Sequence, residues 1–219
     1  MESKLSYHRV RHAEQIKLTV EKANSLGDID IVVNNAGVGL LGAMESYSDE
    51  QIMRQINTNF LGTVRVTQAF IPYFREKKSG LFINVTSMAG LTGFPFSSIY
   101  NATKWALEGW SECLSIELSM FNIEVKTVSP DAAKTDLFTR SSDIVSHPLY
   151  NEAIQKILGG IKPDSTPEQM AEIIYEAATD KKDQLRYLAG ETAKATYARR
   201  LEIGAEDFRK EIKKWFLNL

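Results

Sequence analysis

The chain of 219 residues contains a single cysteine and no long apolar run. Cys113 cannot form an internal disulfide, so the sequence suits a reducing compartment. The amphipathic pattern around Cys113 predicts a small core residue rather than a nucleophile. No apolar segment approaches the roughly 20 residues that a membrane span requires, and the N-terminus lacks the apolar core of a signal peptide. We therefore expect a cytoplasmic protein with no membrane partner.

The chain also lacks an excess of charge of either sign. It has 26 basic and 28 acidic residues and a formal net charge of −2, which gives no reason to expect nucleic acid as a partner. Hydrophobic residues make up 43% and charged residues 25% of the sequence, as is typical of a soluble globular protein. Because no repeat or linker divides the chain, we expect a single domain over residues 1–219.

A dinucleotide-binding glycine loop is a further absence, although residues 37–42 have the spacing G-x-G-x-x-G. The fingerprint requires a helix that begins within the glycines and an acidic residue about 20 positions later. The best helix start is instead Ser48, which forms a capping box with Gln51. The next strand-like run, residues 81–86, ends without an acid. We therefore do not predict a phosphate-binding loop at residues 37–42.

The sequence does contain an alternation of strand and helix patterns. Strands are predicted at residues 28–34, 81–86, 123–129 and 184–189. Helices are predicted at residues 13–26, 49–74, 99–120 and 167–179, with a helical C-terminal tail and a loop region with short helical stretches after residue 129. Short apolar strands separated by helices indicate an α/β fold with a parallel sheet covered on both faces.

Three polar residues follow the second predicted strand, at the edge where such sheets bind ligands. Ser87 stands at the end of the strand, Tyr100 is 13 residues later, and Lys104 lies four positions beyond it. The last two share one helix face, about 5–6 Å apart at Cβ. An ammonium beside a phenol favours the phenolate, so we expect a lowered pKa for Tyr100, as acid/base chemistry near pH 7 requires. By itself such a pair is more often a packed ring with a lysine that reaches water.

Other motifs occur with this pair in a fixed order: Asn-Asn-Ala-Gly at residues 34–37, Asn59, and Ser-Pro-Asp-Ala-Ala-Lys-Thr at residues 129–135. Together they resemble the short-chain dehydrogenase/reductase family, from about Glu14 to the C-terminus. The resemblance implies a Rossmann-like doubly wound parallel sheet and NAD or NADP as cofactor. It implies hydride transfer between the nicotinamide and an alcohol or ketone.

The resemblance also implies a role for each matching residue. Tyr100 would be the acid/base, Lys104 would assist it and bind the nicotinamide ribose, and Ser87 would orient the substrate oxygen. Asn59 would hold a water of the proton relay. The implied cofactor-binding residues are Asn34, Ala36, Gly37, Lys104 and Thr135, and no metal site is predicted. Alternatively, Ser87 only caps the next turn, Asn59 faces solvent, and Asn34 ties down a turn.

The family's N-terminal part has no counterpart in this sequence. Members begin with a strand, a T-G-x-x-x-G-x-G turn and a helix, whereas here 33 residues with one glycine precede Asn34. We therefore expect an N-terminally truncated fold that lacks the first two βα units, about 50 residues. The strand at residues 28–34 would then be an edge strand, and NAD(P) would bind with a dissociation constant near or above about 1 mM. Two functions stay open: an oxidoreductase, or a non-catalytic interaction module that joins a complete subunit.

Three further expectations concern the surroundings of the site. Asp131 replaces the glycine of the family's Pro-Gly turn and is expected to weaken the binding of an anionic cofactor. Residues 136–163 are expected to cover the pocket. Phe138, Ile144, Leu149 and Tyr150 there either contact an apolar substrate or pack a lid. The resemblance finally implies a homo-oligomer that is formed through the helices at residues 49–74 and 99–120.

Overall fold

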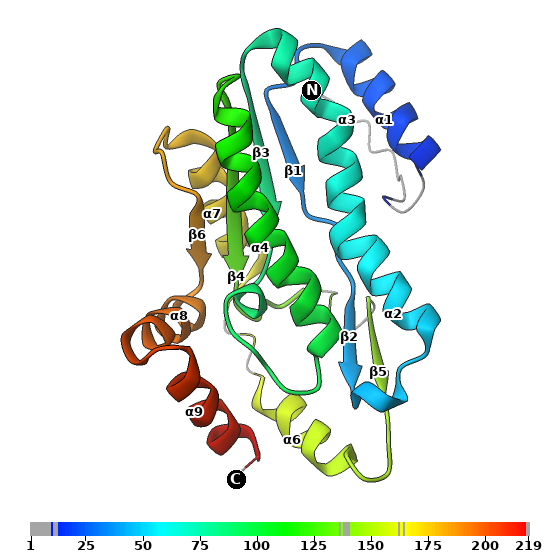
Figure 1. The fold of residues 1–219 in the computed structure, drawn as a ribbon, viewed down its shortest axis with the longest axis vertical. Helices are drawn as coiled ribbons and strands as arrows, with labels where there is room; N and C mark the ends of the chain where they lie inside the picture. Colours follow the sequence, from blue (N-terminus) through cyan, green and yellow to red (C-terminus); the bar gives the residue numbers. More distant parts are fainter. Residues whose placement is uncertain are drawn as a thin grey trace.

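The computed structural model describes residues 10, 13–135, 137, 141–161, 163 and 165–217. Its main sheet has four parallel strands in the order β1-β3-β4-β6 (Figure 1). The strands are β1 (Ile31–Asn34), β3 (Gly80–Val85), β4 (Ile123–Pro130) and β6 (Arg186–Ala189). The strands begin and end within two residues of the predicted positions, except that β1 begins three residues later than predicted. The predicted parallel α/β sheet is confirmed.

Helices cover both faces of this sheet (Figure 1). On one face lie α1 (Ala13–Leu26), α3 (Gly62–Lys77) and α4 (Ser98–Ser119), and on the other lies α7 (Pro167–Thr179). Strand β3 supplies both cores, because successive side chains of a strand point to opposite faces. Its Phe82 packs against Phe74 of α3, whereas Ile83 packs on the side of α7. The doubly wound arrangement is confirmed.

The predicted helix at residues 49–74 consists of three segments. Helix α2 (Asp49–Ile56) begins with the expected capping box, in which Ser48 accepts a hydrogen bond from the Gln51 amide. A π-helical segment, η2 (Asn57–Leu61), then leads into α3. The long helix predicted from Asp49 to about Phe74 is therefore present as a continuous helical run. Hydrophobic periodicity did not detect the single wider turn inside it. Such turns occur often at functional sites, and this one contains Asn59.

A second, two-stranded sheet was not predicted. Strand β2 (Gly39–Gly42) pairs in parallel with β5 (Ser142–Val145). The glycines of the G-x-G-x-x-G spacing permit this pairing: Ser142 fills the space beside Gly39, and a Cβ on Gly42 would lie 2.7 Å from the carbonyl oxygen of Val145. Arg54 of α2 holds β5 through two hydrogen bonds to Asp143, of 2.8 and 3.0 Å.

Three helices lie beyond the carboxyl ends of the main strands (Figure 1). They are α6 (Asn151–Gly160), α8 (Glu191–Ile203) and α9 (Ala205–Leu217). The expectation of a loop region after residue 129 missed β5 and understated α6. The core position expected for Cys113 was also wrong, since its side chain is exposed on α4. None of the helices in the described ranges is long and apolar enough to cross a membrane.

Strand β1 is an edge strand within the described part of the chain, because β3 is its only partner there. Val32 and Asn34 are buried under α1 and α3, whereas Ile31 and Val33 on the opposite face are 37% and 45% exposed. The edge position predicted for residues 28–34 is therefore borne out among these residues. Unpaired backbone groups next to exposed apolar side chains form a surface that favours association.

Phe74→Ala tests the core between α3 and the sheet. The Phe74 ring is fully buried, lies 4.9 Å from the Phe82 ring and fills the space beside Gly80. Its removal is expected to lower the free energy of unfolding by about 3–5 kcal/mol, measured by urea denaturation. The control is Leu201→Ala on α8, where the side chain is 67% exposed and the change should stay within about 0.5 kcal/mol. Equal effects of both variants would contradict this description of the core.

Candidate active site

Ser87 and Tyr100 meet beyond the carboxyl end of β3. Ser87 is the N-cap of the short 3-10 helix η3 (Met88–Gly90), where its Oγ accepts a hydrogen bond from the Ala89 amide at 3.1 Å. The Ser87 side chain also interacts with Tyr100, which lies in the first turn of α4, and this interaction lowers the pKa of the phenol. The cap predicted as the alternative is present, and it leaves the Ser87 hydroxyl proton free for the phenol.

Lys104 lies one turn after Tyr100 and is buried, with 5% of its surface exposed. Its Nζ donates a hydrogen bond to the Val85 carbonyl at 3.0 Å and lies 5.8 Å from the centre of the Tyr100 ring. The alternative of a lysine that reaches past the ring to water is therefore wrong. Burial lowers the pKa of Lys104 to about 8, although the charge of Glu108 opposes this shift.

The pKa of Tyr100 is raised rather than lowered, which corrects the expectation from the sequence. Burial disfavours the phenolate, and this effect exceeds the opposite effect of the Ser87 side chain. The ammonium of Lys104 is hydrogen-bonded to the Val85 carbonyl. Tyr100 in the protein alone is therefore a neutral phenol, ready to donate a proton.

Asn59 holds the loop that follows β1 beside Lys104. It is fully buried in η2, where its Oδ1 accepts from the Val38 amide at 2.8 Å and its Nδ2 donates to the Val38 carbonyl at 3.0 Å. A Cβ on Gly37 would lie 3.7 Å from Asn59 Oδ1 and 3.9 Å from Lys104 Nζ. The solvent-facing alternative for Asn59 is wrong, and the side chain fixes the position of this loop.

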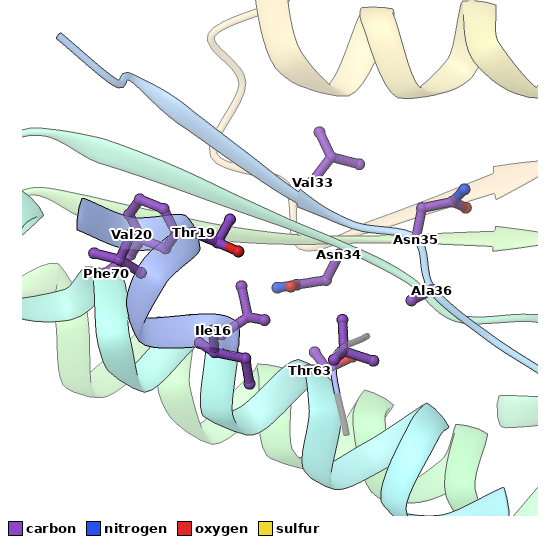
Figure 2. A pocket seen from close by; sticks show the side chains of 11 residues that line it. Ile16, Thr19, Val20, Val33, Asn34, Asn35, Ala36, Thr63 and Phe70 are labelled. Carbon is purple, nitrogen blue, oxygen red and sulfur yellow. The ribbon is translucent and has the colours of Figure 1, made fainter. Parts of the chain in front are cut away.

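A cavity of about 240 Å³ lies at the end of β1. Figure 2 shows Asn34 and Val33 on opposite sides of the strand, with Asn34 directed toward the helices. The Asn34 Nδ2 donates to Thr67 Oγ1 at 3.0 Å and to Asn84 Oδ1 at 2.9 Å, so the side chain links α3 to β3. The lining residues come from α1, α3 and the end of β1 and include Asn34, Asn35 and Ala36.

The predicted site residue Thr135, and Asp131, which was expected to weaken cofactor binding, have no described contact with this group. Thr135 is exposed, and its Oγ1 accepts a hydrogen bond from the Leu137 amide at 3.4 Å. The carboxylate of Asp131 fills the space beside Gly190 at the start of α8, and its Oδ1 is buried without a hydrogen-bond partner among the described residues. No described contact joins either residue to Tyr100.

The segment expected to cover the pocket is anchored to the loop before α4. Phe96 has a left-handed backbone, with φ of 60°, and its carbonyl accepts hydrogen bonds from the Gly42 amide and the Tyr47 hydroxyl. Tyr150 packs on the Phe96 ring at 5.9 Å. Leu149 is 85% exposed. Ile144 is also exposed, and Phe138 lies outside the described residues.

The group fits one end of a nicotinamide dinucleotide. Lys104 offers an ammonium beside the loop at Gly37, and the cavity at Asn34 and Ala36 continues from this loop along β1. In the part of the chain that the structure describes, no helix begins in a glycine-rich turn beside this cavity. A metal site is not indicated there either, since the described ranges contain no cluster of three potential ligands.

Comparisons with known proteins show the family to which the chain is similar. A profile of the family described as short chain dehydrogenase matches residues 6–144. The chain is similar to an uncharacterized oxidoreductase of Schizosaccharomyces pombe, 37% identical over 187 residues that cover 83% of this chain and 79% of that protein. It resembles the structure of a short-chain dehydrogenase from Streptomyces avermitilis, with a TM-score of 0.82, 30% identity and coverage of 96% and 77% of the two chains. For the structure of ElxO with NADP bound, the TM-score is 0.70 at 25% identity, with coverage of 85% and 76%.

Lys104→Met tests the cost of the buried ammonium. The pKa of Lys104 is about 8 in the folded protein and about 10.4 in an unfolded chain. Between these two pKa values the unfolded state binds more protons than the folded state, so the stability of the wild type rises with pH. Below both pKa values the free-energy cost of burying the ammonium does not change with pH. The variant should be more stable at pH 7 by about 1–3 kcal/mol, and the difference should decline above about pH 8. Urea denaturation at several pH values measures it.

Lys126→Met is the matched control for that measurement. Lys126 is also buried but is paired with Asp180 at 3.1 Å, and its pKa is raised. Removal of this lysine leaves the carboxylate without its partner, so the control variant should be less stable than the wild type at pH 7. A Lys104→Met protein that is destabilised like the control would show that burial of the Lys104 ammonium has no net free-energy cost.

Proposed function

Because this chain belongs to the short-chain dehydrogenase family, we propose that it is an oxidoreductase that transfers a hydride between NAD(P) and an alcohol or ketone. The observation that carries the proposal is the position of three side chains at one strand end. The Ser87 side chain interacts with Tyr100, and the buried Lys104 lies one turn further along the same helix. This set can bind a substrate oxygen and exchange a proton with it.

Tyr100 is the proposed acid. Since burial raises its pKa, the phenol is protonated near pH 7 and can donate to the oxygen of a carbonyl substrate. A bound nicotinamide would supply the hydride to the carbonyl carbon. The Ser87 hydroxyl lies beside the phenol and orients the same substrate oxygen. The raised pKa favours the reduction of a ketone near neutral pH over the oxidation of an alcohol.

Lys104 is proposed to offset the charge that Tyr100 acquires when it gives up its proton. Below its pKa of about 8 the side chain is an ammonium, and it is buried, so its field is only weakly screened. We propose that the same ammonium binds the ribose of the cofactor. Asn34, Ala36 and Gly37 are proposed to contact the adenosine side, which the cavity at the end of β1 supports. Thr135 remains a proposed contact of the nicotinamide carboxamide.

We also propose that the protein forms a homo-oligomer through the helices at residues 49–74 and 99–120. Apolar side chains on the outer faces of these helices support this proposal. Met53, Ile116 and Met120 are 49%, 72% and 77% exposed.

Tyr100→Phe is the decisive variant for the function. Because the phenol hydroxyl is the proposed proton donor and the ring remains in place, turnover of a ketone with NADPH or NADH should fall by at least about 100-fold. Binding of the reduced cofactor, followed by its fluorescence, should change little. Steady-state rates with millimolar cofactor and a panel of ketones measure the first effect.

The control is Tyr175→Phe, because Tyr175 on α7 is 71% exposed on the opposite face of the sheet. This variant should keep the wild-type rate. A Tyr100→Phe protein that retains most of its activity would end the assignment of the acid. A wild-type chain that neither binds cofactor nor turns over any ketone would favour the non-catalytic module.

A further inference from the structure

A buried carboxylate lies one turn after Lys104. Tyr100, Lys104 and Glu108 follow one another at four-residue spacing on α4, so their side chains share one face of the helix. Only 4% of Glu108 is exposed. The sequence reasoning stopped at Lys104 and missed Glu108, although the continued spacing was visible.

Glu108 is bound by side chains from three strands. Thr86, after β3, donates to Oε1 at 2.5 Å, and the Ser129 hydroxyl of β4 lies 2.9 Å from the same oxygen. Thr127 of β4 donates to Oε2 at 3.2 Å, and Arg186 Nε of β6 donates to it at 3.0 Å. Every partner is a donor, which matches an ionised carboxylate that only accepts.

The charges of Glu108 and its charged neighbours do not sum to zero. Arg186 also pairs with Glu112, one turn further along α4. Two carboxylates therefore share one guanidinium, which leaves one negative charge on the helix face below Lys104. Because Glu108 is the more buried carboxylate, with 5% of its side chain exposed against 55% for Glu112, its field at Lys104 is the less screened.

We propose that Glu108 is a positioning residue of the active site, whose carboxylate keeps the Lys104 ammonium charged and aligned with Tyr100. Thr86, which holds Glu108, directly precedes Ser87, so the same carboxylate also ties the strand end that carries Ser87 to α4. The link to catalysis rests on the proposed function. The effect on Lys104 does not, because it can be measured without turnover.

The titration of Lys104 supports this role. Burial lowers the pKa of Lys104, and the charge of Glu108 is the opposing influence. Within the described residues, Tyr100 and Glu108 are the titratable groups that face Lys104 from α4. From η2 and the loop after β1 it is faced by Asn59 and Gly37, which are uncharged. Glu108 itself is faced by Glu112 on α4 and by Arg186 on β6.

The first test follows the Lys104 side chain by nuclear magnetic resonance. Full-length protein with ¹³C-labelled lysine is titrated, and the Lys104 signal is assigned with a Lys104→Arg variant. In Glu108→Gln the midpoint of Lys104 should fall by about one pH unit, because an attractive charge one turn away is lost. The matched control is Glu112→Gln, which removes the exposed carboxylate from the same arginine and should move the midpoint by less than about 0.3 unit.

A second variant gives the opposite sign. Arg186→Gln removes the positive charge that partly neutralises Glu108, so the Lys104 midpoint should rise by about half a unit. Arg186 is 30% exposed, so this variant remains informative if Glu108→Gln does not fold. Glu108→Asp keeps the charge and should restore most of the wild-type midpoint. A merely structural role of Glu108 predicts no such pair of opposite shifts.

The pH dependence of ketone reduction is the second readout. Tyr100 needs the ammonium beside it, so activity is lost as the pH rises through the Lys104 midpoint. The alkaline limb of the profile should therefore move about one unit lower in Glu108→Gln and higher in Arg186→Gln. Midpoints that stay unchanged in both variants overturn the proposal, even in an active enzyme. Shifted midpoints in a protein without turnover uphold the role of Glu108 and reject the proposed function instead.

Discussion

The satisfaction of buried polar groups on α4 is the constraint on which the site depends. Three buried side chains of this helix form polar connections to the sheet: Ser111 to Asn84, Lys104 to the Val85 carbonyl, and Glu108 to Thr86 and further partners. A buried polar group without a partner costs free energy. These connections therefore fix the rotation of α4 about its own axis and its position along the sheet. Apolar packing alone tolerates small slides of a helix along a sheet. The polar connections remove this freedom, and Tyr100 is thereby held over the end of β3.

Much of this architecture could be predicted from the sequence because its signals are local. The capping boxes at Ser48 and Thr166 mark the helix starts that the structure contains, and apolar runs gave the four strands of the main sheet. The pairing of β2 with β5 could not be predicted in this way. It joins two four-residue segments about a hundred positions apart, and segments of this length carry no periodic pattern. The π-helical turn at Asn59 is invisible to periodicity for a related reason, since it adds a single residue.

The spacing of Tyr100 and Lys104 indicated that the two side chains lie close together, but it did not indicate the direction in which their pKa values shift. Proximity of an ammonium predicts a lowered tyrosine pKa, whereas desolvation is the largest influence on both groups and raises the pKa of Tyr100 while it lowers that of Lys104. The depth of burial is a property of the whole fold and cannot be read from a spacing of four residues. Glu108 illustrates the same point, because its partners come from three strands that are distant in sequence.

The segment before Tyr100 contains Phe96, whose left-handed backbone is held by two hydrogen bonds to its carbonyl. A bulky residue adopts this conformation at a cost of about 1–3 kcal/mol, and here the hydrogen bonds from Gly42 and Tyr47 to its carbonyl hold it. Gly42 belongs to β2, whose only partner in the described part of the chain is β5. The Gly42 amide therefore attaches the segment before Tyr100 to the small sheet, while α4 attaches Tyr100 to the main sheet. The position of the proposed proton donor depends on both sheets.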